Sequence, residues 1–253
     1  MADTPPGALP PLGSLARSRA LLTAFSWEQT DPARFYALLA ADSARQVAAY
    51  GPLTGRTVLD VGGGPGYFAD AFRSLGATYV GLDADAGELS LHGREVTAGT
   101  VLGSGLALPV RSGAVDVCYS SNVLEHVPDP ERMAGEMVRV TRPGGLVFLS
   151  YNTWLSPNGG HETSPWHYLG GRRAADRYAA RTGRRPKNDY GRTLFPTSVR
   201  RMLRWKDRQV AEGTVEVVHV LPRYHPRWAS WVVRVPAVRE VLTWNLLLVL
   251  RRR

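Results

Sequence analysis

The chain has 253 residues, and its 44% hydrophobic content is enough to build a packed core, which excludes disorder as the dominant state. Its net charge of +9 is unevenly distributed. Residues 1–160 carry 11 Arg and 15 Asp or Glu, whereas residues 161–253 carry 20 Lys or Arg and 7 Asp or Glu. The two parts have net charges of −4 and +13, so the basic character belongs to the last third alone.

Three features of the sequence bear on the location of the protein. The single cysteine, Cys118, excludes a disulfide framework and favours a reducing cytoplasm. Residues 1–25 lack a basic segment followed by an apolar stretch, so we expect a mobile leader and no secretion signal. The longest apolar run, Leu246–Leu250, is far shorter than the about 20 residues that a membrane-spanning helix needs. We therefore predict a cytoplasmic protein.

The first 150 residues predict alternating helices and strands. Asp31-Pro32 begins a helix that ends before Gly51-Pro52. The β-branched run Thr57–Val61 predicts a strand, and after a glycine turn the apolar spacing predicts a helix over 68–75. Further strands are predicted at 78–82, 115–120 and 146–150, with a helix that begins after Asp129-Pro130. This alternation is typical of a doubly wound α/β fold, with a parallel sheet and helices on both faces.

The sequence after Asn152 has a different character. Residues 159–168 are predicted to form a loop, 172–181 and 196–205 helices, and 215–220 a strand. The run Leu246–Leu250 is uniformly apolar, which predicts a strand buried inside a sheet and not at its edge.

The glycine turn has the sequence Gly62-x-Gly64-x-Gly66 between a strand and a helix, which is the context of a nucleotide-binding loop. A dinucleotide fingerprint would need glycine at position 67, where this chain has Tyr67, and Asp60 would repel a pyrophosphate. Asp60 suits a ligand with a cationic group and no phosphate. Asp83, at the end of the second strand, is placed to accept hydrogen bonds from both hydroxyls of a ribose.

An ordered series of motifs extends this pattern over residues 55–152. It comprises Val58–Gly66, Gly81–Asp83, Ala107–Pro109, Val115–Val117, Ser121–Val127 and Arg142–Gly145. The series resembles that of the class I S-adenosylmethionine-dependent methyltransferases, and is most similar to their type 11 subgroup, which acts on small molecules and lipids. The resemblance implies a Rossmann-like sheet of seven mostly parallel strands, with an antiparallel final strand inserted between earlier ones.

The resemblance also implies a single methyltransferase domain over residues 26–253. Within it, residues 55–152 would form the cofactor-binding core. Residues 153–210 would form a helical and loop insertion after the fifth strand, on the substrate side. Residues 211–253 would form the C-terminal strands and an Arg/Trp-rich connection.

The cofactor implied by the resemblance is S-adenosylmethionine, with S-adenosylhomocysteine as its product. Asp60 and the glycines would hold the methionine end, Asp83 the ribose, and the residues after the third strand the adenine. The predicted cofactor contacts are Asp60, Gly62, Gly63, Gly64, Gly66, Asp83, Ala84, Ser104, Gly105, Leu106 and Asn122. Ser104 departs from the family, which often has Asp there, and this leaves the backbone around Gly105 and Leu106 to recognise the base.

The predicted chemistry is an in-line displacement at a sulfonium methyl. It needs an aligned nucleophile and, for a hydroxyl or carboxyl acceptor, the removal of one proton. His126 follows the fourth strand in the loop that should face the methyl group, and its ordinary pKa of about 6.5 suits a general base. The alternative is that Glu125 and His126 only cap the next helix or hold the loop.

Four residues soon after the fifth predicted strand are candidates for substrate binding: His161, Trp166, His167 and Tyr168. They form either a wall or lid over the substrate, or a loop whose aromatic rings pack on the sheet. His161, His167 and the neighbouring Glu162 do not have the spacing of a metal site, so we predict no metal.

The stretch from Arg223 to Arg239 is rich in Arg and Trp and has several interpretations. It binds an anionic substrate, or it lies on an anionic membrane surface with Trp228, Trp231 and Trp244 at the headgroup level. It is otherwise a solvated helix face whose tryptophans lie in the core. A contact with single-stranded RNA is a fourth interpretation, which no recognition motif supports. Pro236 is expected to kink or end a helix here.

Together these features predict methyl transfer to a small-molecule or lipid acceptor, at oxygen, with an anionic acceptor favoured by the basic last third. Peripheral contact with the inner face of the membrane is compatible with this charge. The alternatives are an RNA methyltransferase and a cofactor-binding protein of the same fold without catalysis. DNA is disfavoured as a substrate because Ser120–Val123 lacks the Pro-Pro-Tyr/Phe-type motif that grips a flipped base.

Overall fold

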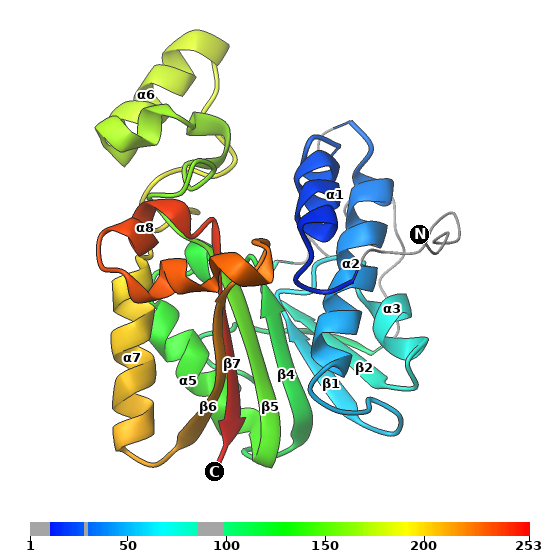
Figure 1. Cartoon of the computed structure of the whole chain (residues 1–253). Helices are drawn as coiled ribbons and strands as arrows, with labels where there is room; N and C mark the ends of the chain where they lie inside the picture. The colour runs from blue at the N-terminus through cyan, green and yellow to red at the C-terminus, as the bar shows by residue number, and fades with distance from the viewer. Residues whose placement is uncertain (1–10, 28–29, 86–98) are drawn as a thin grey trace, which may run out of the picture.

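A computed structural model of the chain describes residues 11–27, 30–85 and 99–253. Seven strands form one sheet in the order β3-β2-β1-β4-β5-β7-β6 (Figure 1). They are β1 (Thr57–Val61), β2 (Thr78–Asp83), β3 (Thr100–Leu102), β4 (Val115–Ser121), β5 (Thr141–Asn152), β6 (Val215–Pro222) and β7 (Asn245–Arg252). Strands β1 to β5 are parallel, and β7 lies antiparallel between β5 and β6. The predicted fold class is confirmed, including the inserted final strand.

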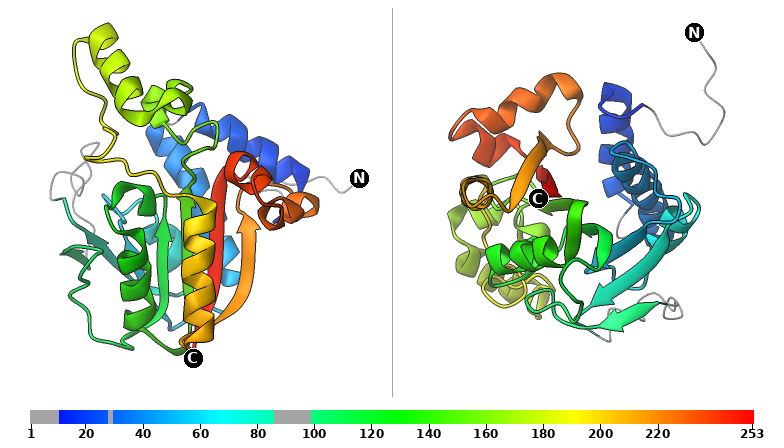
Figure 2. Two further views of the ribbon diagram at one scale, coloured as in Figure 1. Left: turned by 90° about the vertical axis from the view of Figure 1, so that its left-hand side faces the viewer. Right: turned by 90° about the horizontal axis from the view of Figure 1, so that it is seen from below.

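Two layers of helices cover the sheet (Figure 2). On one face lie α2 (Pro32–Ala48) and α3 (Ala69–Arg73), and on the other α5 (Pro130–Val140) and α7 (Val199–Ala211). Asp31 begins α2 as predicted, because its carboxylate accepts a hydrogen bond from the Arg34 backbone N–H and Pro32 occupies the first turn. Asp129 caps α5 in the same way.

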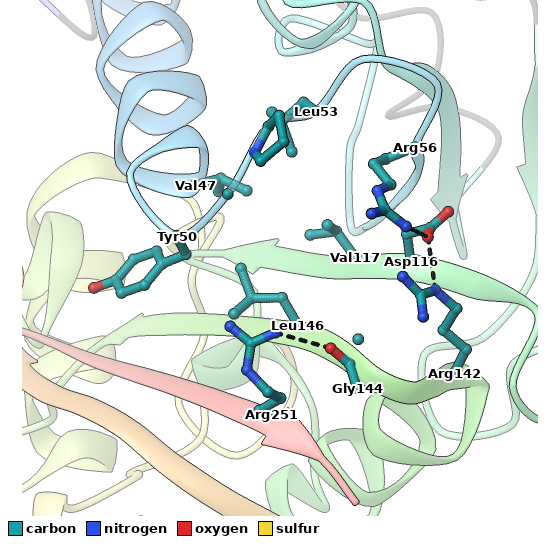
Figure 3. Close-up of a pocket in the computed structure, with 13 residues that line it drawn as sticks. Val47, Tyr50, Leu53, Arg56, Asp116, Val117, Arg142, Gly144, Leu146 and Arg251 are labelled. Atoms are coloured by element: carbon teal, nitrogen blue, oxygen red, sulfur yellow. Dashed lines mark hydrogen bonds and ion pairs between the residues drawn. The ribbon is translucent and has the colours of Figure 1, made fainter.

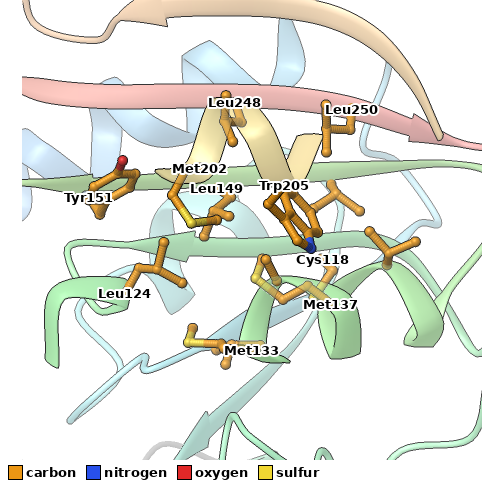
Figure 4. Close-up of a cluster of buried hydrophobic side chains, with 14 of the residues drawn as sticks. Cys118, Leu124, Met133, Met137, Leu149, Tyr151, Met202, Trp205, Leu248 and Leu250 are labelled. Carbon is orange, nitrogen blue, oxygen red and sulfur yellow. The ribbon is translucent and has the colours of Figure 1, made fainter. Parts of the chain in front are cut away.

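The alternation of strand side chains divides the core between the two faces. In β4, Val117 and Tyr119 pack under α2 and α3, whereas Cys118 packs under α5 and α7 (Figure 4). In β7, Leu246, Leu248 and Leu250 join the α5 and α7 side, and Leu247 and Val249 the other. Because helices cover both faces of β7, its buried positions are all apolar apart from Asn245 at its start.

Residues 15–25 were predicted to belong to a mobile leader, and this prediction is wrong. They form α1 (Leu15–Phe25), whose first turn is capped by the Ser14 side chain. Arg17 in this helix is 3% exposed and forms a salt bridge with the fully buried Asp42 of α2, with 2.7 Å between Nη2 and Oδ2. An ion pair between distant residues leaves no periodic signal, so the prediction missed it. Residues 1–10 lie outside the described residues.

The segment predicted as an insertion, 153–210, divides into two parts. The first contains the short 3-10 helices η3 (His161–Thr163) and η4 (Trp166–Leu169) and the helix α6 (Gly171–Thr182), which project above the sheet in Figure 1. The second, α7, is part of the layer that covers the sheet, because Val199, Met202 and Trp205 are buried in its core. The insertion boundary predicted at residue 210 is therefore too late.

The Arg/Trp-rich stretch forms the 3-10 helix η5 (Arg227–Arg234) and the short helix α8 (Val238–Leu242), with Pro236 between them as predicted. Its tryptophans are not all in the core. Trp228 is 72% exposed and Trp231 49% exposed, whereas Trp244 packs against Phe25 with 4.9 Å between ring centroids. The core interpretation is therefore wrong for Trp228 and Trp231.

Within the described residues, no helix is both long enough and apolar enough to span a membrane.

Candidate functional site

The predicted site residues lie mostly at the edge of the sheet where the parallel strands end. The glycine turn follows β1, Asp83 ends β2 and Asn122 follows β4. In Figure 1 this is the upper edge, above which α6 projects. Ligands of open α/β sheets bind outside the carboxyl ends of the strands.

A pocket also lies at the opposite edge, where the strands begin (Figure 3). Its polar residues are joined to one another. The Asp116 carboxylate accepts hydrogen bonds from Arg56 at 2.9 Å and from Arg142 at 2.7 Å, and Arg251 donates to the Gly144 carbonyl at 2.9 Å. These bonds join the segments at the lower edge of the sheet. The pocket contains none of the predicted site residues.

The glycine turn has a backbone that only glycine adopts easily. Gly62, Gly64 and Gly66 have φ angles of +81°, +51° and +79°, in the left-handed region. A Cβ atom on Gly62 would lie 2.3 Å from Val123, in the loop after β4. The turn is therefore packed directly against the loop that carries Glu125 and His126.

Asp60, in β1, is 2% exposed and accepts a hydrogen bond from the Tyr79 hydroxyl at 2.7 Å. Burial raises the pKa of Asp60 to about 7; the Tyr79 hydrogen bond opposes this rise and the nearby Asp83 charge adds to it. Among the described residues, no salt bridge connects Asp60 to a basic side chain. Gly63 is adjacent, because a Cβ atom there would lie 3.1 Å from Asp60 Oδ2. A cationic group placed here would stabilise the ionised carboxylate.

Asp83 connects the end of β2 to the glycine turn. Its Oδ2 accepts a hydrogen bond from the Gly64 backbone N–H at 3.0 Å, and its Oδ1 accepts from the Asp85 N–H at 3.1 Å. Ala84 follows and is exposed. These two bonds orient the carboxylate and leave lone pairs on both oxygens for a ligand.

The loop after β3 holds the residues predicted to contact adenine. Ser104 is exposed, and its hydroxyl accepts a hydrogen bond from the Leu106 backbone N–H at 3.2 Å. Gly105 is closely packed, because a Cβ atom there would lie 3.3 Å from Val61 and 3.4 Å from Met133. The Ser104 hydroxyl thus stabilises its own loop, and a larger side chain at Gly105 would displace that loop.

Asn122 lies in the left-handed region, with a φ angle of +57°. Its Oδ1 accepts a hydrogen bond from Asn245 Nδ2 at 2.7 Å, and its Nδ2 donates to the Tyr224 hydroxyl at 3.4 Å. This network joins the end of β4 to the start of β7. Neither Asn245 nor Tyr224 was predicted from the sequence, although a polar residue at the start of an apolar strand was a signal for the former.

Glu125 and His126 lie in η2 (Leu124–His126), directly after β4. Glu125 is 2% exposed; its Oε1 accepts a hydrogen bond from the Asn152 backbone N–H at 3.0 Å, and burial raises its pKa. The Nδ1 atom of His126 lies 2.7 Å from the Thr193 carbonyl oxygen. This carbonyl can only accept, so in the neutral imidazole Nδ1 carries the proton and Nε2 the lone pair.

The four predicted substrate residues do not form one wall. His161 lies beside His126, with 5.2 Å between ring centroids, and burial, with the nearby His126 and His167, lowers its pKa to about 3. His167 is 1% exposed, and its ring nitrogens lie near the Ser156 carbonyl and the Ser164 hydroxyl. His167 therefore has a structural role within the loop.

The other two predicted substrate residues, Trp166 and Tyr168, are exposed on η4. The Arg177 guanidinium lies 3.9 Å from the centre of the Trp166 ring. The Tyr168 hydroxyl donates to the Leu155 carbonyl at 3.3 Å. These contacts stabilise the projecting part of the chain, and neither of them is with the glycine turn.

The fold and the upper edge together define a class of protein. An open sheet with a glycine turn after β1 and a carboxylate at the end of β2 is the architecture of a nucleotide-cofactor enzyme. A buried Asp60 beside that turn favours a cofactor with a cationic end.

Comparisons with known proteins agree with this class. Residues 59–149 match a sequence family described as a methyltransferase domain. An uncharacterized methyltransferase of Mycobacterium marinum is 53% identical over 249 residues, which cover 95% of this chain and 96% of that protein. One of Mycolicibacterium gilvum is 54% identical over 250 residues, with 94% and 95% covered.

Solved structures share the fold at low identity. An S-adenosylmethionine-dependent methyltransferase of Mesorhizobium loti has a TM-score of 0.57 and 20% identity, covering 84% of this chain and 98% of its own. A geranyl diphosphate methyltransferase in complex with S-adenosylmethionine has a TM-score of 0.51 and 17% identity, covering 97% and 94%. The chain belongs to the class I S-adenosylmethionine-dependent methyltransferases of type 11. S-adenosylmethionine is therefore its cofactor.

Proposed function

We propose that this enzyme transfers a methyl group to an oxygen atom of a small-molecule or lipid acceptor that carries an anionic group. The observation that supports this best is the contact between Gly62 and Val123. It puts the predicted cofactor turn directly against the loop of Glu125 and His126, whose polar atoms are suited to an acceptor oxygen. The acceptor would therefore be oriented within reach of the methyl group.

The residues at the upper edge fit S-adenosylmethionine, whose sulfonium supplies the methyl group. The Asp60 carboxylate would accept hydrogen bonds from the ammonium, which satisfies its buried charge. The free lone pairs of Asp83 would accept from the ribose hydroxyls. Ser104, Gly105 and Leu106 would line the adenine, and Ala84 and Asn122 would complete the predicted contacts.

Charge and polar atoms indicate the kind of acceptor. Residues 161–253, which include the segments above the sheet, carry the whole excess of positive charge. His126 Nε2 offers the lone pair that proton removal from a hydroxyl requires. Both features favour an anionic oxygen acceptor over a neutral amine.

The direct test is an activity screen with labelled methyl donor. Extracts of a bacterial cell would be incubated with the protein and isotopically labelled S-adenosylmethionine, and labelled products identified by mass spectrometry. We expect the label in a small molecule or lipid, and none with Asp60→Asn. Label in the RNA fraction would support RNA methylation instead. Cofactor binding without any labelled product would support a non-catalytic protein.

Peripheral contact with an anionic membrane is the second part of the proposal, and it would bring the enzyme to a lipid acceptor. It is supported by the exposed Trp228 and Trp231. The Arg227 N–H donates to the Gly13 carbonyl at 2.7 Å, so the exposed Leu12 and Leu15 belong to a neighbouring segment. Aromatic, aliphatic and basic side chains together are typical of an interfacial surface.

Vesicle sedimentation tests this contact. We expect binding to vesicles with anionic lipid and not to purely zwitterionic ones, with loss of binding in the double variant Trp228→Ala, Trp231→Ala. Trp166→Ala is the matched control, because Trp166 is also exposed but lies on η4. Equal binding by the double variant and the control would contradict the proposal.

A further inference from the structure

Three side chains from separate segments meet at the upper edge of the sheet. Glu125 and His126 come from η2, and His161 from η3, after β5. Their potential ligand atoms all lie within 4.8 Å of one another. We propose that Glu125, His126 and His161 bind a divalent transition-metal ion.

The cluster contains buried polar atoms that have no hydrogen-bond partner among the described residues. Within the described part of the chain, neither Glu125 Oε2 nor His161 Nε2 has a hydrogen-bond partner. A buried polar atom without a hydrogen bond costs about 1–3 kcal/mol of stability. Two such atoms within one cluster therefore need an explanation. A metal ion between them would satisfy both, together with the free Nε2 of His126.

Two of these side chains, His126 and Glu125, are each already held by one backbone partner. The Thr193 carbonyl accepts from His126 Nδ1, which selects the tautomer with its lone pair on Nε2. The Asn152 N–H donates to Glu125 Oε1, and Oε2 is the oxygen that has no partner among the described residues. Such backbone partners behind a ligand are typical of metal sites.

The donor set indicates the class of ion. Two imidazoles and one carboxylate suit zinc, iron, cobalt or manganese, whereas calcium and magnesium prefer oxygen ligands. Ligand atoms at bond lengths of about 2.0–2.2 Å around zinc lie closer together than 4.8 Å, so any pair of ligand atoms near that limit would move closer on binding. His161 lies in a short turn with a φ angle of +48°, and this turn would make that adjustment.

The prediction of no metal considered His161 with His167 and Glu162, which are neighbours in sequence. The fold selects a different set. His167 turns toward the Ser156 carbonyl, and the Glu162 carboxylate accepts from Asn188 at 3.0 Å. Only the tertiary structure brings His161 to Glu125 and His126.

Metal binding by these residues does not depend on the proposed function, but it would add a step to its mechanism. Three protein ligands leave at least one coordination position, which is typical of catalytic sites. An acceptor hydroxyl bound there would lose its proton to solvent water more easily, and this second step rests on the proposed oxygen methylation. His126 would then act as a ligand and not as a free base.

The test measures metal binding in the absence of cofactor and acceptor. The full chain would be treated with chelator, then titrated with Zn²⁺ and with Co²⁺, following metal content and the visible absorption of cobalt. We expect one ion per chain. Affinity should fall in His161→Ala and in Glu125→Gln by more than the roughly 10- to 100-fold that loss of a ligand's hydrogen-bond partner costs.

His219→Ala is the matched control, because it removes a histidine that lies outside the cluster, on β6, where its Nδ1 lies 3.1 Å from the Tyr50 hydroxyl. It should bind one ion with the affinity of the unmodified chain. If Glu125→Gln fails to fold, His161→Ala still decides, with circular dichroism and cofactor binding as checks of its fold. An unmodified chain that binds neither ion, or equal binding by His161→Ala, would overturn the metal site. Either result leaves the proposed methyl transfer open to its own test.

Discussion

The two edges of the sheet hold carboxylates whose pKa values are shifted in opposite directions. At the lower edge, Asp116 accepts hydrogen bonds from the Thr57 backbone N–H and from the side chains of Arg56 and Arg142. Burial alone would raise the pKa of Asp116, but these bonds together lower it. This carboxylate is satisfied by the chain itself and closes the edge.

At the upper edge, Asp60 has one neutral donor, Tyr79, and burial raises its pKa to about 7. Glu125 is also buried, with one oxygen that lacks a partner among the described residues. These carboxylates cost stability in the protein alone, and a bound cation would recover that cost. Strongly perturbed carboxylates of this kind indicate the edge at which ligands bind.

Glycine substitutions are expected to give the largest difference in the free energy of unfolding between the two edges. Gly62→Ala at the upper edge adds a Cβ atom 2.3 Å from Val123 in a backbone with a φ angle of +81°. We expect a loss of about 2–5 kcal/mol in the free energy of unfolding. Gly55 at the lower edge has a φ angle of +71°, but an added Cβ atom would meet no atom within 4 Å. We therefore expect Gly55→Ala to lose only about 1–2 kcal/mol of the free energy of unfolding. Urea unfolding measures both, and equal losses would refute the close packing of the turn.

The next largest effect is expected on cofactor binding. Asp60→Asn removes the charge that would hold the ammonium, and should weaken S-adenosylmethionine binding by about 1.5–3 kcal/mol, roughly 10- to 100-fold. Asp116→Asn is the lower-edge control. It should leave affinity unchanged and reduce the free energy of unfolding. Titration calorimetry and urea unfolding separate the two effects, and a similar loss of affinity in both variants would count against the assignment.

The two carboxylates also predict opposite responses to pH. The pKa of Asp60 rises from 3.8 to about 7 on folding, so its ionisation destabilises the free protein increasingly from pH 3.8 up to about 7. Asp116 has a lowered pKa, so its contribution to stability is lost as the pH falls through that pKa.

Cofactor affinity should follow Asp60. It should fall by up to about tenfold per pH unit below pH 7, because a protonated carboxyl cannot pair with the ammonium. Calorimetry from pH 5.5 to 8.5 would measure this, with Asp60→Asn as a reference that lacks the dependence. A flat profile in the unmodified chain would be incompatible with the assignment of Asp60.

The smallest effect is expected at Tyr79. Tyr79→Phe removes the hydrogen bond that opposes the rise in the pKa of Asp60. Affinity at pH 7 should fall by about two- to tenfold, as expected for about 0.5–1.5 kcal/mol, and the midpoint of the pH profile should move upward. A midpoint that moves downward would mean that Tyr79 does not stabilise the ionised form.

Local patterns in the sequence were sufficient to predict the glycine turn and six of the seven strands, whereas the short β3 (Thr100–Leu102) was not predicted from them. The β-branched run Thr57–Val61, the glycines after it and the uniformly apolar Leu246–Leu250 each have a short-range physical cause. A strand covered on both faces must be apolar throughout, and a turn with positive φ angles must use glycine. The place of the final strand inside the sheet therefore follows from the apolar character of its own residues.

The tertiary structure decided what depends on contacts between distant segments. It paired Arg17 of α1 with Asp42 of α2, in a segment that the sequence predicted to be a mobile leader. It also buried Arg223, one of the basic residues of the Arg/Trp-rich stretch, where the guanidinium donates to the Ser121 and Ser150 hydroxyls at 2.6 and 2.7 Å. Neither contact has a periodicity that a sequence can show, because each depends on side chains that only folding brings together.

The functional residues divide along the same line. Asp60 and Asp83 lie near the ends of their strands and Gly62 directly follows β1, so the sequence determined their place at one edge of the sheet. The meeting of His161 with Glu125 and His126 depends on how the segment after β5 folds back over that edge. The sequence by itself determined the edge at which the cofactor should bind, whereas only the packing of that segment decided which polar groups face one another beside it.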